Sequence, residues 1–160
     1  KQIPNFVTLG NLACGCVGIA FANAGNLWGA ALMVVLAAVF DFFDGFVARL
    51  LNVKSEIGAQ LDSLADMVSF GVLPAFIAHN LFIIAAIDES WARLYFLNGA
   101  NSPALLVFVF ALSGCYRLAN FNVSTDQTTS FKGLPIPAAG LYLASFTLIY
   151  RFGPFKYLFF

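Results

Sequence analysis

The fold is decided by residues 41–66, which read DFFDGFVARLLNVKSEIGAQLDSLAD. Four aspartates stand in this stretch as two pairs, and the short polar link 52–55 separates the pairs. A long apolar run precedes the first pair and another follows the second. Because a short link joins neighbouring helices, the pattern predicts two antiparallel helices that carry acidic side chains near their shared end.

The composition around this stretch indicates a membrane environment. The chain has 160 residues, of which 61% are hydrophobic and 10% are charged. Soluble domains carry roughly 25% charged residues, so this chain lacks the polar side chains for a water-covered surface. Its net charge of zero gives no basic surface for nucleic acid. We therefore predict an all-α integral membrane protein with no nucleic-acid partner.

Five apolar segments and the start of a sixth are long enough to cross a bilayer, which takes about 20 residues. They are expected over residues 6–24, 27–50, 56–87, 103–121 and 137–150, with the sixth beginning after Pro154. Pro74 is expected to kink the third segment, because proline lacks the backbone N–H donor. The prediction is a single transmembrane domain over residues 1–160, a bundle of about six helices whose last is incomplete.

The basic residues predict how this bundle is oriented. With five helices, the N-terminus, the 52–55 link and the loop after the fourth helix lie on one side. That side carries Lys1, Arg49, Lys54, Arg117 and Lys132, and the other carries Arg93, Arg151 and Lys156. Basic residues are enriched on the cytoplasmic side of membrane proteins. We therefore expect insertion in the cell membrane with the aspartates facing the cytoplasm.

The spacing of the four aspartates predicts a metal site. Asp41 and Asp44 are three residues apart, and Asp62 and Asp66 are four apart, so each pair shares a helical face. A carboxylate at the bilayer centre costs at least roughly 2.5–3.5 kcal/mol, and clustered carboxylates repel each other unless a cation joins them. Oxygen ligands favour Mg²⁺, Mn²⁺ or Ca²⁺.

Buried ion pairs are the alternative explanation for these aspartates. Arg49, Lys54 and Arg117 are the basic residues that would form them. Ion pairs do not require acidic residues at spacings of three and four, so the metal site is the preferred interpretation.

Small residues and one arginine accompany the aspartates. Gly45, Ala48 and Gly58 would let a ligand approach the helix backbone, although close packing between helices uses the same residue types. Arg49 can bind a phosphate through two hydrogen bonds. Next to metal ligands, this set favours a flat or phosphorylated ligand.

The full pattern over residues 41–66, D-x2-D-G-x2-A-R-x8-G-x3-D-x3-D, resembles the signature of the CDP-alcohol phosphotransferases. These membrane enzymes use an alcohol to displace CMP from a CDP-linked substrate. Three further stretches resemble the phosphatidylserine synthase branch of that family: IPNFVTLGNLACG at 3–15, YRLANFN at 116–122 and FKGLPIPAAG at 131–140. The resemblance covers nearly the whole chain.

The resemblance implies a reaction and a set of metal ligands. The reaction is transfer of a phosphatidyl group from CDP-diacylglycerol, or an ether-lipid equivalent, to the hydroxyl of L-serine, giving phosphatidylserine and CMP. Asp41, Asp44 and Asp62 would hold two divalent ions, Mg²⁺ or Mn²⁺ with Ca²⁺ as a further option. Asp66 would contribute to one ion and serve as the general base.

The resemblance also implies substrate contacts and a homodimer. The CDP moiety would be lined by Gly45, Ala48, Arg49 and Gly58, with Ser55, Asn5 and Thr8 as further candidates. For the serine carboxylate, the expected binding residues are Arg117, Asn120 and Lys132, which share the predicted cytoplasmic side. Anchoring at the membrane interface is the alternative role for the basic residues among them.

Three other functions stay open at this point. Within the family, the acceptor alcohol would be glycerol phosphate or inositol phosphate. Outside it, an intramembrane prenyltransferase would also use aspartates with Mg²⁺, but on two separate motifs, whereas all four acids here fall within residues 41–66. A divalent-cation transporter would use membrane carboxylates but has no need for the adjacent Arg49, and the sequence lacks the paired broken helices of transporters.

Overall fold

The computed structural model describes residues 3–50, 56–87, 103–123 and 134–152, and every element in these ranges is a helix. In chain order the elements are α1 (Ile3–Asn23), α2 (Leu27–Leu50), α3 (Glu56–Asp66), the π-helix η1 (Met67–Val72), α4 (Leu73–Ile87), the 3₁₀-helix η3 (Pro103–Val107), α6 (Phe108–Val123) and α7 (Ile136–Phe152). The predicted all-α class is confirmed. The predicted sixth segment lies outside the described residues.

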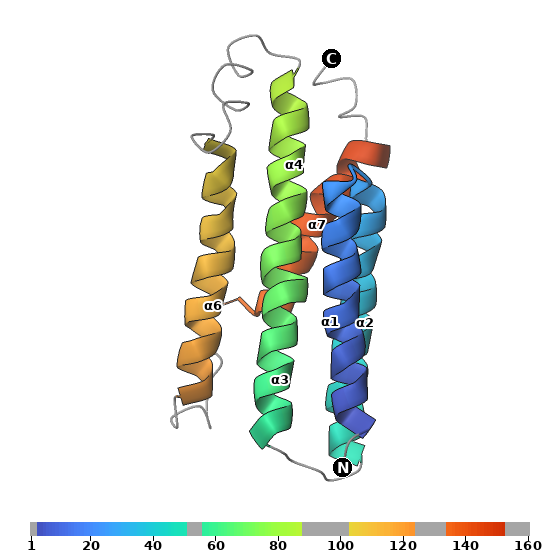
Figure 1. The fold of residues 1–160 in the computed structure, drawn as a ribbon, viewed down its shortest axis with the longest axis vertical. Coiled ribbons are helices and arrows are strands. Elements are labelled where there is room, and N and C mark those ends of the chain that lie inside the picture. Colours follow the sequence, from blue (N-terminus) through green and yellow to red (C-terminus); the bar gives the residue numbers. More distant parts are fainter. Residues whose placement is uncertain (1–2, 51–55, 88–102, 124–133, 153–160) are drawn as a thin grey trace.

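A tight turn joins α1 to α2. Gly25 takes a positive φ of 78°, a conformation that glycine adopts without strain. The side chain of Asn26 then accepts a hydrogen bond of 2.9 Å from the backbone N–H of Gly29, which caps the first turn of α2. α1 and α2 consequently pack as an antiparallel pair (Figure 1).

One long helical rod is built from α3, η1 and α4 (Figure 1). Pro74, the second residue of α4, was expected to kink this rod. The structure places a departure from α geometry just before it, the π-helical segment η1. Proline has no N–H to donate to the carbonyl one turn earlier, and a π segment is one way in which a helix accommodates such a lost bond.

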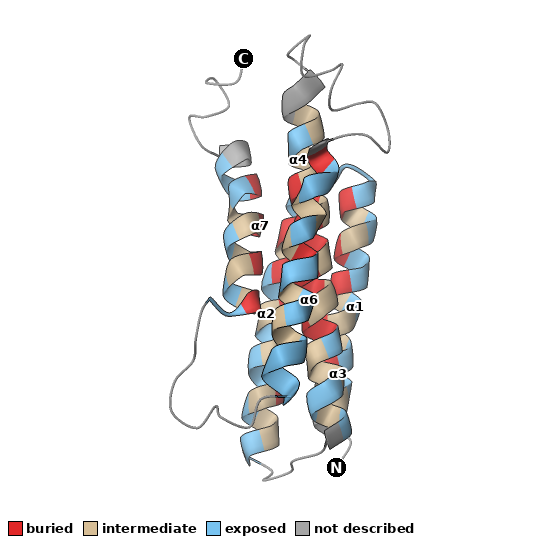
Figure 2. Cartoon of the chain, turned by 90° about the vertical axis from the view of Figure 1, so that its left-hand side faces the viewer, coloured by how far each residue is buried: buried red, intermediate tan, exposed pale blue. Residues whose placement is uncertain are grey.

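Within the part of the chain that the structure describes, four helices are long and apolar enough to cross a membrane: Asn5–Asn23, Leu27–Leu50, Ile57–Ile84 and Ala104–Val123. Ile136–Ile149 is a shorter apolar helix. Large hydrophobic side chains lie on the outside of the bundle, among them Phe42, Leu106 and Leu112, each at least two-thirds exposed. Figure 2 shows exposed residues along the outer helix faces and buried ones toward the middle. This arrangement fits lipid around the protein, and the chain is an integral membrane protein.

The centre of the bundle forms around η1, which contacts α1, α4, α6 and α7. Phe70 is fully buried, and a Cβ on Gly140 of α7 would lie only 2.8 Å from the Phe70 carbonyl oxygen. A Cβ on Gly15 of α1 would similarly lie 2.6 Å from the hydroxyl oxygen of Ser69. Glycine therefore permits two helices to approach the π segment directly, and Asp66 is the residue that precedes this segment.

Candidate active site

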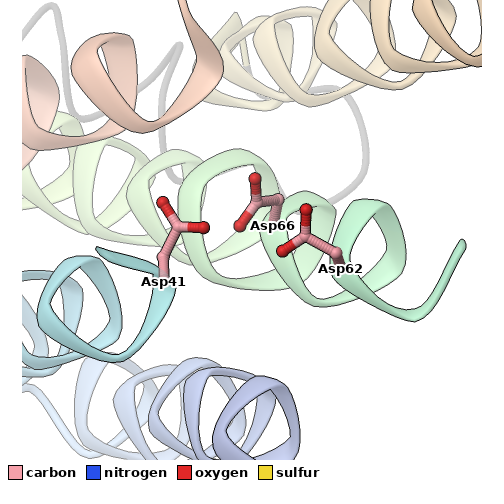
Figure 3. A group of neighbouring side chains, drawn as sticks. All are labelled: Asp41, Asp62 and Asp66. Atoms are coloured by element: carbon pink, nitrogen blue, oxygen red, sulfur yellow. The ribbon is translucent and has the colours of Figure 1, made fainter. Parts of the chain in front are cut away.

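Three of the four predicted aspartates meet in one cluster. Asp41 extends from α2 and Asp62 and Asp66 extend from α3, and Figure 3 shows their carboxylates turned toward one another. One carboxylate oxygen from each of the three lies within 4.8 Å of those of the others. Asp66 is buried, and the other two are partly buried. The i,i+4 spacing of the α3 pair accounts for their shared face.

α1 packs against both helices that carry the cluster, α2 and α3. α2 runs antiparallel to the α3–η1–α4 rod, as predicted (Figure 1). It packs against η1 and α4 of that rod, so the prediction that the two long helices are neighbours is confirmed. Over the described residues, α3 itself makes few direct contacts with α2.

Asp44 lies beside this cluster and not within the group of three. Its side chain is 6% exposed, and the hydroxyl of Thr8 on α1 donates a hydrogen bond to it. Its charge still repels those of Asp62 and Asp66 through space. Thr8, which was predicted as a candidate to bind the CDP moiety, therefore contacts Asp44 in the structure.

The oxygens in this region fit a divalent cation. Asp44 Oδ2 and Asp62 Oδ1 are both buried and have no hydrogen-bond partner among the described residues. A buried carboxylate oxygen without a donor is costly, and these are hard oxygen ligands of the kind that Mg²⁺ and Mn²⁺ prefer.

Asn11 is a site residue that the sequence interpretation missed. Its side-chain Nδ2 donates a hydrogen bond of 3.1 Å to Asp66 Oδ1, and Asn11 itself is fully buried in α1. An amide inside an apolar membrane helix usually has a polar partner on another helix. That rule marks Asn11 for attention, but the partner is 55 residues away in the sequence and cannot be read from it.

Gly45 and Arg49 interact along the last turns of α2. The Nε of Arg49 donates a hydrogen bond of 3.1 Å to the Gly45 carbonyl, and the arginine side chain is exposed. Among the described residues, the one atom that a Cβ on Gly45 would approach within 4 Å is an Arg49 guanidinium nitrogen, at 3.5 Å. Gly45 thus leaves open space beside Asp44, which suits the predicted approach of a ligand.

The other candidate residues occupy different environments. Ala48, Gly58 and Asn5 are partly buried, Arg117 is partly buried on α6, and Asn120 is exposed near the end of α6. Ser55 and Lys132 lie outside the described residues.

A polar contact connects α6 with α3 beside the cluster. The amide Nδ2 of Asn122 donates a hydrogen bond of 3.1 Å to the hydroxyl of Ser63, which follows Asp62. Asn122 is exposed and Ser63 is partly buried. The end of α6 that carries Arg117 and Asn120 is thereby held close to the aspartate end of α3.

The profile of the CDP-alcohol phosphatidyltransferase family matches residues 1–159, which is the whole of the described helical bundle. The chain belongs to this family. The predicted resemblance is confirmed, and neither a prenyltransferase nor a cation transporter is favoured by the match.

Curated relatives indicate which branch of the family the chain resembles. A CDP-diacylglycerol–serine O-phosphatidyltransferase of Bacillus subtilis is 34% identical over 151 residues, covering 94% of this chain and 78% of its own. A Helicobacter pylori protein of the same name is 35% identical over 91% of this chain and 57% of its own. An archaetidylserine synthase of Methanothermobacter thermautotrophicus is 34% identical over 91% and 58%.

These names agree with the predicted serine branch, and they describe transferases. The chain spans less than two-thirds of the Helicobacter and Methanothermobacter relatives, and 78% of the Bacillus one. No solved structure matches the chain significantly.

Proposed function

We propose that this chain transfers a phosphatidyl group, or its ether-lipid counterpart, from a CDP-linked lipid to the hydroxyl of L-serine, releasing CMP. The observation that carries the proposal is the cluster of Asp41, Asp62 and Asp66, in which carboxylates from two membrane helices converge within the family signature. The names of the Bacillus and archaeal relatives support serine as the acceptor and leave both lipid backbones open.

The four aspartates are the proposed metal ligands. Asp41, Asp44 and Asp62 would hold two ions, Mg²⁺ or Mn²⁺ with Ca²⁺ as a further option, and Asp66 would contribute to one. When bound, such ions supply positive charge to the pyrophosphate and to the departing CMP. The buried, unpartnered oxygens of Asp44 and Asp62 support this assignment.

Asp66 is the proposed general base. Its carboxylate would accept the proton of the serine hydroxyl as that oxygen attacks the lipid-proximal phosphorus. The new P–O bond joins serine to the lipid phosphate, and the bond from this phosphorus to the oxygen of the CMP phosphate breaks. The protein's remaining contribution is to position the reactants and to complement their charge.

The proposed substrate contacts lie in the family signature and in α1, α6 and the loop that follows α6. Gly45, Ala48, Arg49 and Gly58 would line the CDP moiety, with Asn5, Thr8 and Ser55 as further candidates. Arg49 is exposed at the end of α2, from which its guanidinium can turn to a phosphate. For the serine carboxylate the candidates are Arg117, Asn120 and Lys132. The contact between Asn122 and Ser63 supports the first two, since it holds the end of α6 beside α3.

The site is proposed to face the cytoplasm from the cell membrane, where the nucleotide and serine arrive from water and the lipid tails from the bilayer. The excess of basic residues on that side supports this orientation. We further propose a homodimer, as the family resemblance implies.

A transfer assay tests the function. Purified protein in detergent micelles receives CDP-diacylglycerol, labelled serine and Mn²⁺, and parallel reactions contain glycerol phosphate or inositol phosphate in place of serine. We expect CMP and labelled phospholipid with serine. CMP release with a phosphorylated alcohol alone would assign the chain to a sister branch, and no CMP with any acceptor would refute the proposal.

Replacing the proposed base tests the mechanism. Asp66→Ala and the nearly isosteric Asp66→Asn should each lower kcat by roughly 10²–10⁴-fold. Ser113→Ala is the control and should keep wild-type turnover. Ser113 is exposed, and its hydroxyl donates a hydrogen bond to the Phe110 carbonyl of its own helix. Wild-type rates in Asp66→Asn would remove the base role.

A further inference from the structure

Asn11 is tied to the rod that carries Asp66 by two separate hydrogen bonds. Its side-chain Nδ2 donates to Asp66 Oδ1 at 3.1 Å. Its backbone carbonyl accepts a hydrogen bond of 3.0 Å from the hydroxyl of Ser69, three residues further along the rod. Asn11 and Ser69 are both 0% exposed, so neither bond competes with water.

The hydrogen bond between the Ser69 hydroxyl and the Asn11 carbonyl depends on the absence of a side chain at Gly15. Ser69 Oγ occupies the space that a Cβ on Gly15 would enter, at 2.6 Å from it. Gly15 lies one helical turn after Asn11 and thereby opens the path to the Asn11 carbonyl. Gly15 and Ser69 together fix the position of α1 along the rod.

The hydrogen bond from the Asn11 amide has a different consequence, because its acceptor is the carboxylate of Asp66 in the cluster. A hydrogen bond to one oxygen of a carboxylate restricts rotation of its plane and commits that oxygen to the donor. The amide orientation is set by the partner, since the reverse orientation would direct Asn11 Oδ1 at an aspartate oxygen. In the present orientation Asn11 Oδ1 is buried with no partner among the described residues.

We propose that Asn11 is a positioning residue for Asp66. Its amide holds one aspartate oxygen and leaves the other to serve the cluster formed with Asp41 and Asp62. The contact with Ser69 has a supporting role, since it fixes α1 without touching the carboxylate. The catalytic part of this inference rests on the proposed function of Asp66, whereas its effect on the cluster does not.

The test compares two variants that each remove one of the two bonds. Asn11→Ala removes the amide, and Ser69→Ala removes only the hydroxyl contact with the Asn11 backbone. Residues that hydrogen-bond to a metal ligand contribute roughly 10–100-fold to metal affinity or activity. We expect Asn11→Ala to lower kcat and Mn²⁺ affinity by that factor, with KM for the CDP-lipid within about threefold. Ser69→Ala should keep both quantities within about threefold.

Mn²⁺ affinity is measured directly by electron paramagnetic resonance on the purified protein without substrate, so this readout survives failure of the transfer assay. A wild type that releases no CMP refutes the proposed function, whereas the binding comparison still decides the role of Asn11. Asn11→Ser, which keeps a polar group too short to reach Asp66, replaces Asn11→Ala if the latter does not yield a monodisperse protein.

A double variant shows whether Asn11 acts through Asp66. In the Asp66→Asn background, Asn11→Ala should add less than about threefold to the loss of Mn²⁺ affinity, because the partner of the amide has already changed. Independent, multiplying losses would overturn the proposal. So would equal losses of affinity and thermal stability in Asn11→Ala and Ser69→Ala, which would make Asn11 a packing residue only.

Discussion

Gly140 of α7 offers a quantitative test of how closely the bundle is packed around the π segment. A Cβ built on Gly140 would lie 2.8 Å from the carbonyl oxygen of Phe70, 2.9 Å from its Cα and 3.0 Å from its Cβ. Two of these three atoms belong to the backbone of η1, so no side-chain rotation relieves the contact. Gly140→Ala therefore requires α7 or the π segment to move.

The magnitude follows from comparison with a matched glycine. At Gly114 of α6, an added Cβ would meet its nearest atom, a methyl of Ile136, at 3.6 Å, which is an ordinary contact. Both substitutions gain the same helix propensity, about 0.5–1 kcal/mol. The difference between the variants therefore isolates the overpacking, which costs about 1–3 kcal/mol in a well-packed core.

The assay is unfolding in mixed micelles with increasing denaturing detergent, followed by loss of helical circular dichroism. We expect Gly140→Ala to be less stable than Gly114→Ala by about 1–3 kcal/mol and Gly114→Ala to equal or exceed the wild type. Equal stabilities of the two variants would refute the packing argument, and so would the reverse order.

Three further predictions concern the site. Gly45→Ala should raise KM for the CDP-lipid at least roughly tenfold with no loss of stability, since its Cβ meets nothing closer than 3.5 Å; an unchanged KM, measured by CMP release, would remove Gly45 from the pocket. Asp62→Asn should lower Mn²⁺ affinity, measured by paramagnetic resonance, yet raise metal-free stability by about 0.5–2 kcal/mol, because it removes a buried charge and the repulsion of that charge by Asp44 and Asp41; lower stability would contradict this reasoning. Chelation with EDTA should abolish transfer and added Mg²⁺ or Mn²⁺ should restore it, and full activity after exhaustive chelation would exclude a metal role.

Much of the fold was predictable because the bilayer imposes simple rules. The predicted spans 27–50 and 56–87 coincide with α2 and with the α3–η1–α4 rod. Spacing alone placed Asp62 and Asp66 on one helical face, and the short link after α2 made the two helices antiparallel. Each of these inferences uses only residues near one another in the chain.

The parts that were missed depend on contacts between distant residues. Nothing near Asn11 in the sequence reveals that it bonds Asp66, and nothing near Thr8 reveals its contact with Asp44. The packing of α1 against both α2 and α3 is a result of the same kind. Pro74 signalled a departure from regular helix, but a missing donor alone does not specify a π segment.

That π segment also sets the rotational phase between the two halves of its rod. Each residue of an α-helix advances the helix by about 100°, whereas η1 closes wider turns over Met67–Val72. The direction of Asp62 and Asp66 is therefore offset from the packing face of α4 by an amount that the length of η1 determines. If Met67–Val72 formed a regular α-helix instead, each residue would advance the rod by the full 100° or so, and the aspartates would point in a different direction relative to α4. The direction of the carboxylates thus depends on the π geometry of η1 as well as on residue identity.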